Sequence, residues 1–123
     1  MESKTSTGLD QNIAGLLCYL LGWITGIIFL LIEKDNRFVR FHAVQSIIVF
    51  GGVTVVSIVI SILSGMIWAI GGPFGVLSVL LGAISTIIWL IALILWIVLM
   101  VKAYQNEYFK LPVVGDMAEQ QLG

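Results

Sequence analysis

No charged residue stands between Arg40 and Lys102, so residues 41–101 form a run without Asp, Glu, Lys or Arg. Charged residues make up only 11% of the 123-residue chain, whereas an ordinary soluble domain has about 25%. A soluble domain of this length cannot bury such a run in its core. We therefore expect an all-α integral membrane protein.

The apolar sequence divides into segments that are long enough to cross a bilayer. Residues 13–32 form one uncharged stretch, and about 20 residues of helix match the roughly 30 Å of hydrocarbon. The long run exceeds one crossing, and Gly71-Gly72-Pro73 is its strongest turn signal. A second break in the run would give four crossings, which stays an alternative. The main prediction is a bundle of three transmembrane helices over about 13–32, 41–70 and 74–101.

Polar segments flank this transmembrane domain, which we place at 13–110. Residues 1–12 are predicted to be a polar N-terminal tail. Residues 111–123 are predicted to be an interfacial tail with a short helix, because Asp116 and Glu119 have the D-x-x-E spacing of a helix N-terminus.

The connection after the first apolar stretch begins at Glu33 and carries a helix start signal. Asp35 or Asn36 is expected to cap a helix that begins near Arg37. Three crossings would place five of the six basic residues on one side of the membrane and only Lys4 on the other. Positive residues favour the cytoplasmic side, so this arrangement predicts a cytoplasmic C-terminus and an N-terminus outside.

The residue pattern argues against several classes of function. The predicted spans carry no Asp, Glu, Lys or Arg, which ion-coupled transporters normally need. We find no metal-ligand spacing, no nucleophile–base pair and no phosphate-binding loop. The net charge of −1 argues against a nucleic-acid binder. We expect a non-enzymatic protein without cofactor or metal, whose partners are the lipid bilayer and either further copies of itself or other membrane proteins.

Small residues recur on each predicted span at spacings of three and four. Such residues allow the backbones of membrane helices to approach closely. Two interpretations remain open, namely packing within one chain and an interface between chains. The candidate helix-packing or oligomer residues are Gly15, Gly22, Gly26, Ser57, Ser61, Ser78, Gly82 and Ser85.

Cations and aromatic residues alternate in the segment 37–42, RFVRFH, at the predicted cytoplasmic face. Arginine at this depth either anchors the topology or binds lipid phosphates or an acidic partner. For His42 we weigh a hydrogen bond to the tail or to a headgroup against a pH switch. The candidate face comprises Lys34, Arg37, Arg40, His42, Gln45, Lys102, Lys110 and Asp116.

Two tryptophans, Trp23 and Trp89, fall near the middle of predicted spans. An indole N–H at that depth needs a hydrogen-bond acceptor. A backbone carbonyl beside a glycine is the simple solution, and a ligand groove is the alternative.

Two motifs carry a resemblance that extends from residue 15 to residue 119. Residues 29–46 (FLLIEKDNRFVRFHAVQS) and 103–119 (AYQNEYFKLPVVGDMAE) resemble the signatures of a family of small prokaryotic membrane proteins. That family is grouped with the chloroplast Tic-twenty proteins of the inner-envelope import translocon. The resemblance implies the plasma membrane of a prokaryote and a role in protein translocation, and it implies no catalytic residue.

Three hypotheses for the function follow. The first is a non-enzymatic subunit of a protein-translocation or membrane-assembly complex. The second is a homo-oligomeric channel or small-solute permeation protein, in which serine-bearing stripes of several chains would line a pore. The third is an anionic-lipid-binding, membrane-organising protein that uses Lys34, Arg37 and Arg40.

Overall fold

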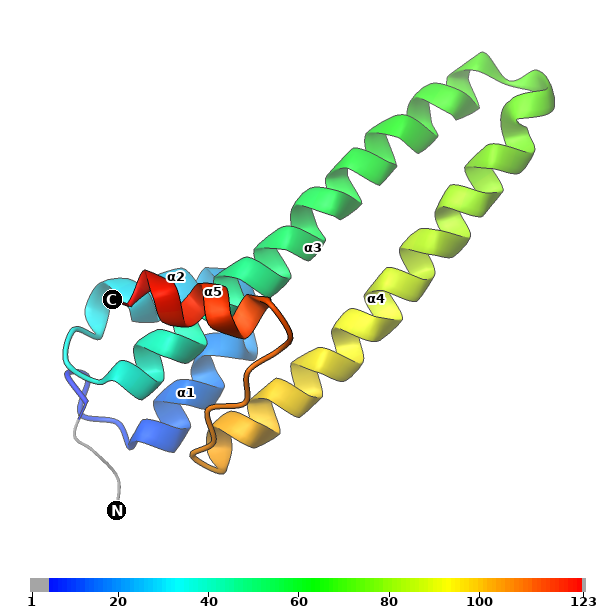
Figure 1. Ribbon diagram of the computed structural model, residues 1–123. Coiled ribbons are helices and arrows are strands. Elements are labelled where there is room, and N and C mark those ends of the chain that lie inside the picture. Colours follow the sequence, from blue (N-terminus) through cyan, green and yellow to red (C-terminus); the bar gives the residue numbers. More distant parts are fainter. Residues whose placement is uncertain (1–4, 123) are drawn as a thin grey trace.

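A computed structural model describes residues 5–122, and the regular structure in that part is entirely helical (Figure 1). Helices α3 and α4 form one long hairpin, and α1, α2 and α5 gather around its open end. We call this end, with the first turns of α3 and the last turns of α4, the base. The elements are α1 (Gln11–Leu20), α2 (Trp23–Ile32), α3 (Arg37–Ile70), a short 3-10 turn (Gly72–Phe74), α4 (Gly75–Tyr104) and α5 (Val114–Gln121).

The apolar stretch 13–32 is not one helix, because the chain breaks at Gly22. This residue has φ 64° and ψ −134°, a conformation that glycine adopts at little cost. Thr25 Oγ1 accepts a hydrogen bond from the Leu21 amide at 3.1 Å and donates to the Cys18 carbonyl at 3.2 Å. The side chain thus satisfies backbone groups that the break leaves free.

The break changes the predicted topology. Helices α1 and α2 have 10 residues each, or about 15 Å of helix, and neither crosses about 30 Å of hydrocarbon. They fold back on one another, since Asn36 Nδ2 beyond the end of α2 donates to Gln11 Oε1 at the start of α1 at 2.9 Å. The prediction of a continuous span over 13–32 is therefore wrong, and the structure does not show a bundle of three spans.

The long hairpin agrees with the predicted turn and extends past the predicted helix ends. Helix α3 begins at Arg37, as the capping signal predicts and ahead of the predicted span 41–70, and Asn36 Oδ1 caps it by accepting from the Val39 amide at 3.0 Å. The turn follows Gly71, which has φ 73°. Within the described residues, the two segments long and apolar enough to cross a membrane are Arg37–Ile70 and Gly72–Tyr104.

The hydrophobic core lies entirely in the base. No residue between Phe50 and Ala92 is buried, and side chains such as Trp68 (73% exposed) and Val76 (71% exposed) are bare. An apolar surface of this extent marks a membrane-contacting region. The long hairpin is therefore built to be covered by lipid or by other membrane helices.

Helix α5 forms near the predicted position but begins differently from the expectation. Its first residue is Val114, so Asp116 lies in the first turn instead of capping the helix. The helix docks through Ala118, which is fully buried in a cluster with Phe41 and Val44 of α3. Outside the core, Lys110 Nζ pairs with Glu119 Oε2 at 2.8 Å.

Candidate functional site: the polar base and the groove between the long helices

Three buried polar side chains form one hydrogen-bonded network in the base. Tyr19 Oη of α1 lies 2.6 Å from His42 Nδ1 and accepts from Gln45 Nε2 at 3.0 Å. His42 Nε2 lies 2.9 Å from the Glu107 carbonyl. Because a carbonyl only accepts, Nε2 carries the proton, and Nδ1 accepts from the tyrosine hydroxyl. Of the two hydrogen bonds considered for His42, the structure shows one within the protein, to the polar segment that follows α4.

The same network holds the segment that leads from α4 to α5. Gln45 Nε2 donates to the Phe109 carbonyl at 3.0 Å, and Gln45 Oε1 accepts from the Leu111 amide at 3.2 Å. One glutamine thus replaces the backbone pairing that an irregular segment lacks.

Aromatic rings enclose His42. The centroids of Phe38 and Phe41 lie 4.6 and 5.2 Å from the imidazole centroid in edge-to-face geometry, and Tyr108 stacks at 6.4 Å. His42 and Gln45 are fully buried. These two residues therefore belong to the interior of the base and do not lie on an exposed face.

A second polar cluster forms around the buried carboxylate of Glu33. It accepts from the Ser6 amide at 2.9 and 3.0 Å, from the Ser6 hydroxyl at 2.8 Å, and from the Asp35 and Asn36 amides at 3.1 and 3.0 Å. Desolvation raises the pKa of Glu33, but these hydrogen bonds together outweigh it and hold the pKa below the usual 4.5.

Arg40 serves the same part of the base. Its Nη1 donates to the Leu30 carbonyl at 3.1 Å and to the Glu33 carbonyl at 2.6 Å. The guanidinium therefore caps the C-terminal end of α2, where carbonyl groups lack helical partners.

The eight residues predicted for a cytoplasmic face do not form one surface. Lys34 and Arg37 are exposed and have no ion pair with another described residue. Lys102 Nζ pairs with Glu107 Oε2 at 3.2 Å, Lys110 pairs with Glu119, and Asp116 is exposed on α5. The exposed cations without an ion partner are thus reduced to Lys34 and Arg37 in the part that the structure describes.

The predicted small residues also divide into two groups. Gly15, Gly22 and Gly26 pack inside the base; a Cβ atom on Gly26 would lie 2.9 Å from the Ala43 carbonyl oxygen. The other group lies between the two long helices. Ser61, Ser78, Gly82 and Ser85 line one hollow there, and Ser57 lines an adjoining one.

This groove between α3 and α4 carries polar side chains, and not all of them have a hydrogen-bond partner. Ser64 Oγ and Ser78 Oγ lie 3.0 Å apart. Ser57 Oγ is shielded from solvent and has no hydrogen-bond partner among the described residues.

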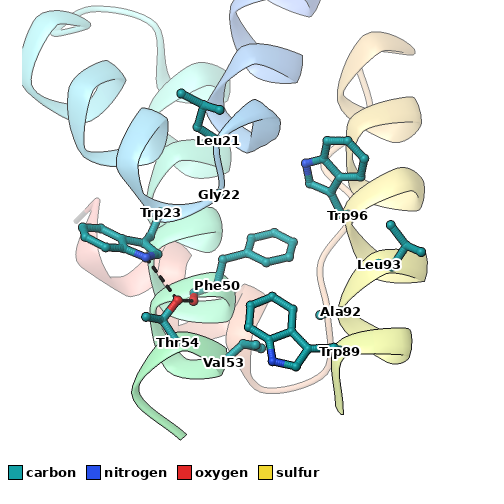
Figure 2. A pocket seen from close by; sticks show the side chains of 10 residues that line it. All are labelled: Leu21, Gly22, Trp23, Phe50, Val53, Thr54, Trp89, Ala92, Leu93 and Trp96. Carbon is teal, nitrogen blue, oxygen red and sulfur yellow. Dashed lines mark hydrogen bonds between the residues drawn. The ribbon is translucent and has the colours of Figure 1, made fainter. Parts of the chain in front are cut away.

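Nearer the base, the groove continues into a cavity of about 290 Å³ at the tip of the α1–α2 hairpin (Figure 2). Trp23 Nε1 donates to Thr54 Oγ1 at 3.1 Å, and Trp96 Nε1 donates to the Tyr19 carbonyl at 2.6 Å. The cavity is lined by Leu21, Gly22, Trp23, Phe50, Val53, Thr54, Trp89, Ala92, Leu93 and Trp96.

Sequence reasoning identified only part of this lining. It placed Trp23 and Trp89 near the middle of the membrane, and it did not associate Phe50 or Trp96 with them. The association depends on the break at Gly22, which brings the hairpin tip between the long helices.

Two bare apolar helices that project from a hydrogen-bonded base define a helical membrane protein. The chain belongs to the magnetosome magnetite crystal formation protein family, whose model matches residues 6–118. It is 53% identical over 117 residues to a UPF0132 membrane protein of Methanocaldococcus jannaschii, covering 95% of this chain and 93% of the relative. It is 50% identical over 115 residues to a UPF0132 membrane protein of Archaeoglobus fulgidus, covering 94% and 98%. No solved structure matches.

These matches correct the family assignment. The resemblance to the Tic-twenty-like family is wrong, because the family model and the archaeal relatives point elsewhere. The specific role in protein translocation was implied by that resemblance, and the matches do not support it.

Proposed function

We propose that this protein is a non-enzymatic membrane subunit that assembles laterally with a second copy of itself through the groove between α3 and α4. The observation that carries this proposal is the row of serine and glycine residues in the groove, Ser61, Ser78, Gly82 and Ser85. In lipid, such residues mark places where another helix packs closely.

The position of the α1–α2 hairpin favours an interface between chains over packing within one chain. A three-helix bundle would cover the groove with its own first span. Here α1 and α2 stay in the base, and no residue from 51 to 91 is buried.

A helix packed into the groove accounts for its lining better than a pore does. Ile58 and Ile62 share one hollow with Ser57 and Ser61. Mixed apolar and hydroxyl surfaces suit contacts between helices, whereas water-filled pores need a continuous polar lining. We therefore place helix packing ahead of a homo-oligomeric channel.

Two crossings, by α3 and α4, complete the proposal. The N-terminus, the connection at Glu33 and the tail then lie on one side, so all six basic residues of the sequence share it. This distribution supports a cytoplasmic location for both termini and replaces the N-outside orientation that three spans implied. The membrane is the plasma membrane of a prokaryote.

Disulfide crosslinking tests the interface. Cys18 is the single cysteine and is buried, so Cys18→Ser provides the background. We expect Ser61→Cys and Ser85→Cys to yield crosslinked dimers in native membranes under mild oxidation. Val59→Cys and Val79→Cys are matched controls, because both side chains are exposed on the same helices and line none of the hollows described. Equal crosslinking of all four variants, or none, would reject the interface.

A second candidate function is binding of anionic lipid at the base. It is favoured by Lys34 and Arg37, which are exposed and have no ion pair with a described residue. We expect the double variant Lys34→Gln and Arg37→Gln to bind phosphatidylglycerol more weakly in detergent micelles. Lys102→Gln is the control, because that ammonium is already paired with Glu107. Unchanged lipid binding in the double variant would remove this candidate.

A further inference from the structure

The cavity at the hairpin tip is bounded by aromatic rings from three helices. Trp23 comes from α2, Phe50 from α3, and Trp89 and Trp96 from α4 (Figure 2). Its volume of about 290 Å³ is near the lower limit of about 300 Å³ for small-molecule sites. Flat aromatic walls favour a flat occupant, because rings stack with offset faces or meet edge to face.

The hydrogen bonds of the cavity leave one indole without a partner. Trp23 and Trp96 donate to Thr54 and to the Tyr19 carbonyl. Trp89 has no hydrogen-bond partner among the described residues, its ring extends from α4 toward α3 (Figure 2), and it is 51% exposed. An indole N–H only donates, so a fitting occupant supplies an acceptor.

Ser57 is a second side chain that would gain a hydrogen-bond partner from such an occupant. It lines the hollow that adjoins the cavity, together with Trp89, and its enclosed hydroxyl lacks a partner. Its hydroxyl turns between staggered rotamers, so Ser57 is a candidate second donor to an acceptor in the hollow that it shares with Trp89.

The position of Trp89 along α4 indicates whether the acceptor oxygen comes from a phospholipid or from another molecule in the membrane. Trp89 lies midway along α4, Gly75–Tyr104, about 20 Å from either end at 1.5 Å per residue. Phospholipid ester and phosphate oxygens lie at the faces of the hydrocarbon core, about 15 Å from its centre. In the two-crossing arrangement proposed above, Trp89 lies deeper than these oxygens, which favours an acceptor on a molecule that dissolves within the hydrocarbon itself.

We infer that this cavity binds a lipid-soluble quinone: a planar ring that lies against the indoles, carries a carbonyl oxygen to Trp89 Nε1, and leaves its apolar tail in the surrounding lipid. The ring site lies nearer the base than the main part of the dimer interface proposed above, which uses the serines and glycine nearer the distal turn.

The test measures quinone binding to the full chain in lipid nanodiscs. The probe is a benzoquinone with a decyl tail, and bound quinone is counted after gel filtration, with empty nanodiscs subtracted. We expect saturation near one quinone per chain. Decylbenzene has a planar six-membered ring and the same tail but no carbonyls, and we expect it not to displace the quinone.

Three variants assign the site. Trp89→Phe keeps a ring and removes the donor, so we expect the Kd to rise about tenfold, the upper range for one hydrogen bond. Ser57→Ala should weaken binding several-fold for the same reason. Trp68→Phe is the control, because Trp68 lines the distal hollow, and its Kd should be unchanged. Circular dichroism is the check that each variant keeps its helix content.

Four outcomes would overturn the inference. They are binding no greater than in empty nanodiscs, equal displacement by decylbenzene, an unchanged Kd in Trp89→Phe, and crosslinking of two copies through cysteine at position 89. The last outcome would show that a second chain occupies the cavity. If the protein binds no quinone but Ser61→Cys still forms crosslinked dimers, the quinone site is rejected and the proposed dimer is retained.

Discussion

Ser6 and Glu33 join the two ends of the α1–α2 hairpin. The Ser6 amide donates to both carboxylate oxygens of Glu33, at 2.9 and 3.0 Å, and the Ser6 hydroxyl donates to one of them at 2.8 Å. Ser6 precedes α1 and Glu33 follows α2, so the chain enters and leaves the hairpin on the same side. This contact therefore fits a hairpin whose two ends lie on one side, and it does not fit a topology in which residues 13–32 cross the membrane.

Acid should loosen the hairpin through Glu33. Its pKa in the folded protein is below the usual 4.5, so ionisation of Glu33 stabilises the fold above pH 4.5, and this contribution is lost as the pH falls through the folded-state pKa. We expect the melting temperature in detergent to fall as the pH drops below 4.5. Glu33→Gln should melt lower at pH 7 and should show a flatter pH profile. An unchanged profile in this variant would contradict the assignment. Glu107→Gln, on an exposed residue, is the control.

Gln45→Ala should release the segment between α4 and α5. The substitution leaves the Phe109 carbonyl and the Leu111 amide without their partner, and each unsatisfied group costs about 1–3 kcal/mol. We expect faster hydrogen exchange at Leu111 and faster proteolysis after Lys110. Gln120→Ala, on an exposed residue of α5, should leave both rates unchanged. Exchange at Leu111 that equals the wild type would show that Gln45 does not hold the segment.

Gly26 and Gly82 should respond differently to alanine. A Cβ atom on Gly26 would meet the Ala43 carbonyl oxygen at 2.9 Å, whereas nothing lies within 4 Å of one on Gly82. We expect Gly26→Ala to lower stability by about 1–3 kcal/mol, as overpacking does. Gly82→Ala should melt like the wild type and should reduce dimer crosslinking through Ser61→Cys. A large loss of stability in Gly82→Ala, or unaltered crosslinking, would contradict this prediction.

Cysteine labelling should place both ends of the chain on one side of the membrane. In the Cys18→Ser background, a membrane-impermeant maleimide should reach Asp10→Cys and Gln120→Cys from the cytoplasmic side, and Pro73→Cys from the opposite side. All three positions are exposed. Three crossings would instead place Asp10 and Gln120 on opposite sides, so labelling of these two positions from different sides would refute the two-span topology.

Local signals predicted several elements of the fold correctly. Gly71-Gly72-Pro73 predicts the turn of the long hairpin, because consecutive glycines and a proline cannot continue a helix, and α3 ends at Ile70. Asn36 caps α3 as expected. These features depend on residues near each other in the chain, so the sequence alone suffices to find them.

Long-range contacts explain what sequence reasoning missed. The stretch 13–32 has the length and hydropathy of a span, and its break at Gly22 is held by distant atoms, including Ser46 Oγ, which donates to the Gly22 carbonyl at 2.9 Å. His42, Gln45 and Arg40 looked like members of an exposed face, because their spacing places them near the membrane surface. Their partners, Tyr19, Glu107 and Leu30, belong to other segments.

The sequence by itself determined that this protein enters the membrane, because 61 consecutive residues without an Asp, Glu, Lys or Arg side chain leave no other way to satisfy the hydrophobic effect. It also determined where the long hairpin turns. Only the tertiary structure decided how many helices are long enough to cross, which small residues stay in the groove, and which tryptophans share the cavity. Those outcomes depend on hydrogen bonds between residues far apart in the chain. The break at Gly22 is an example, because distant residues hold the chain in its bent conformation there.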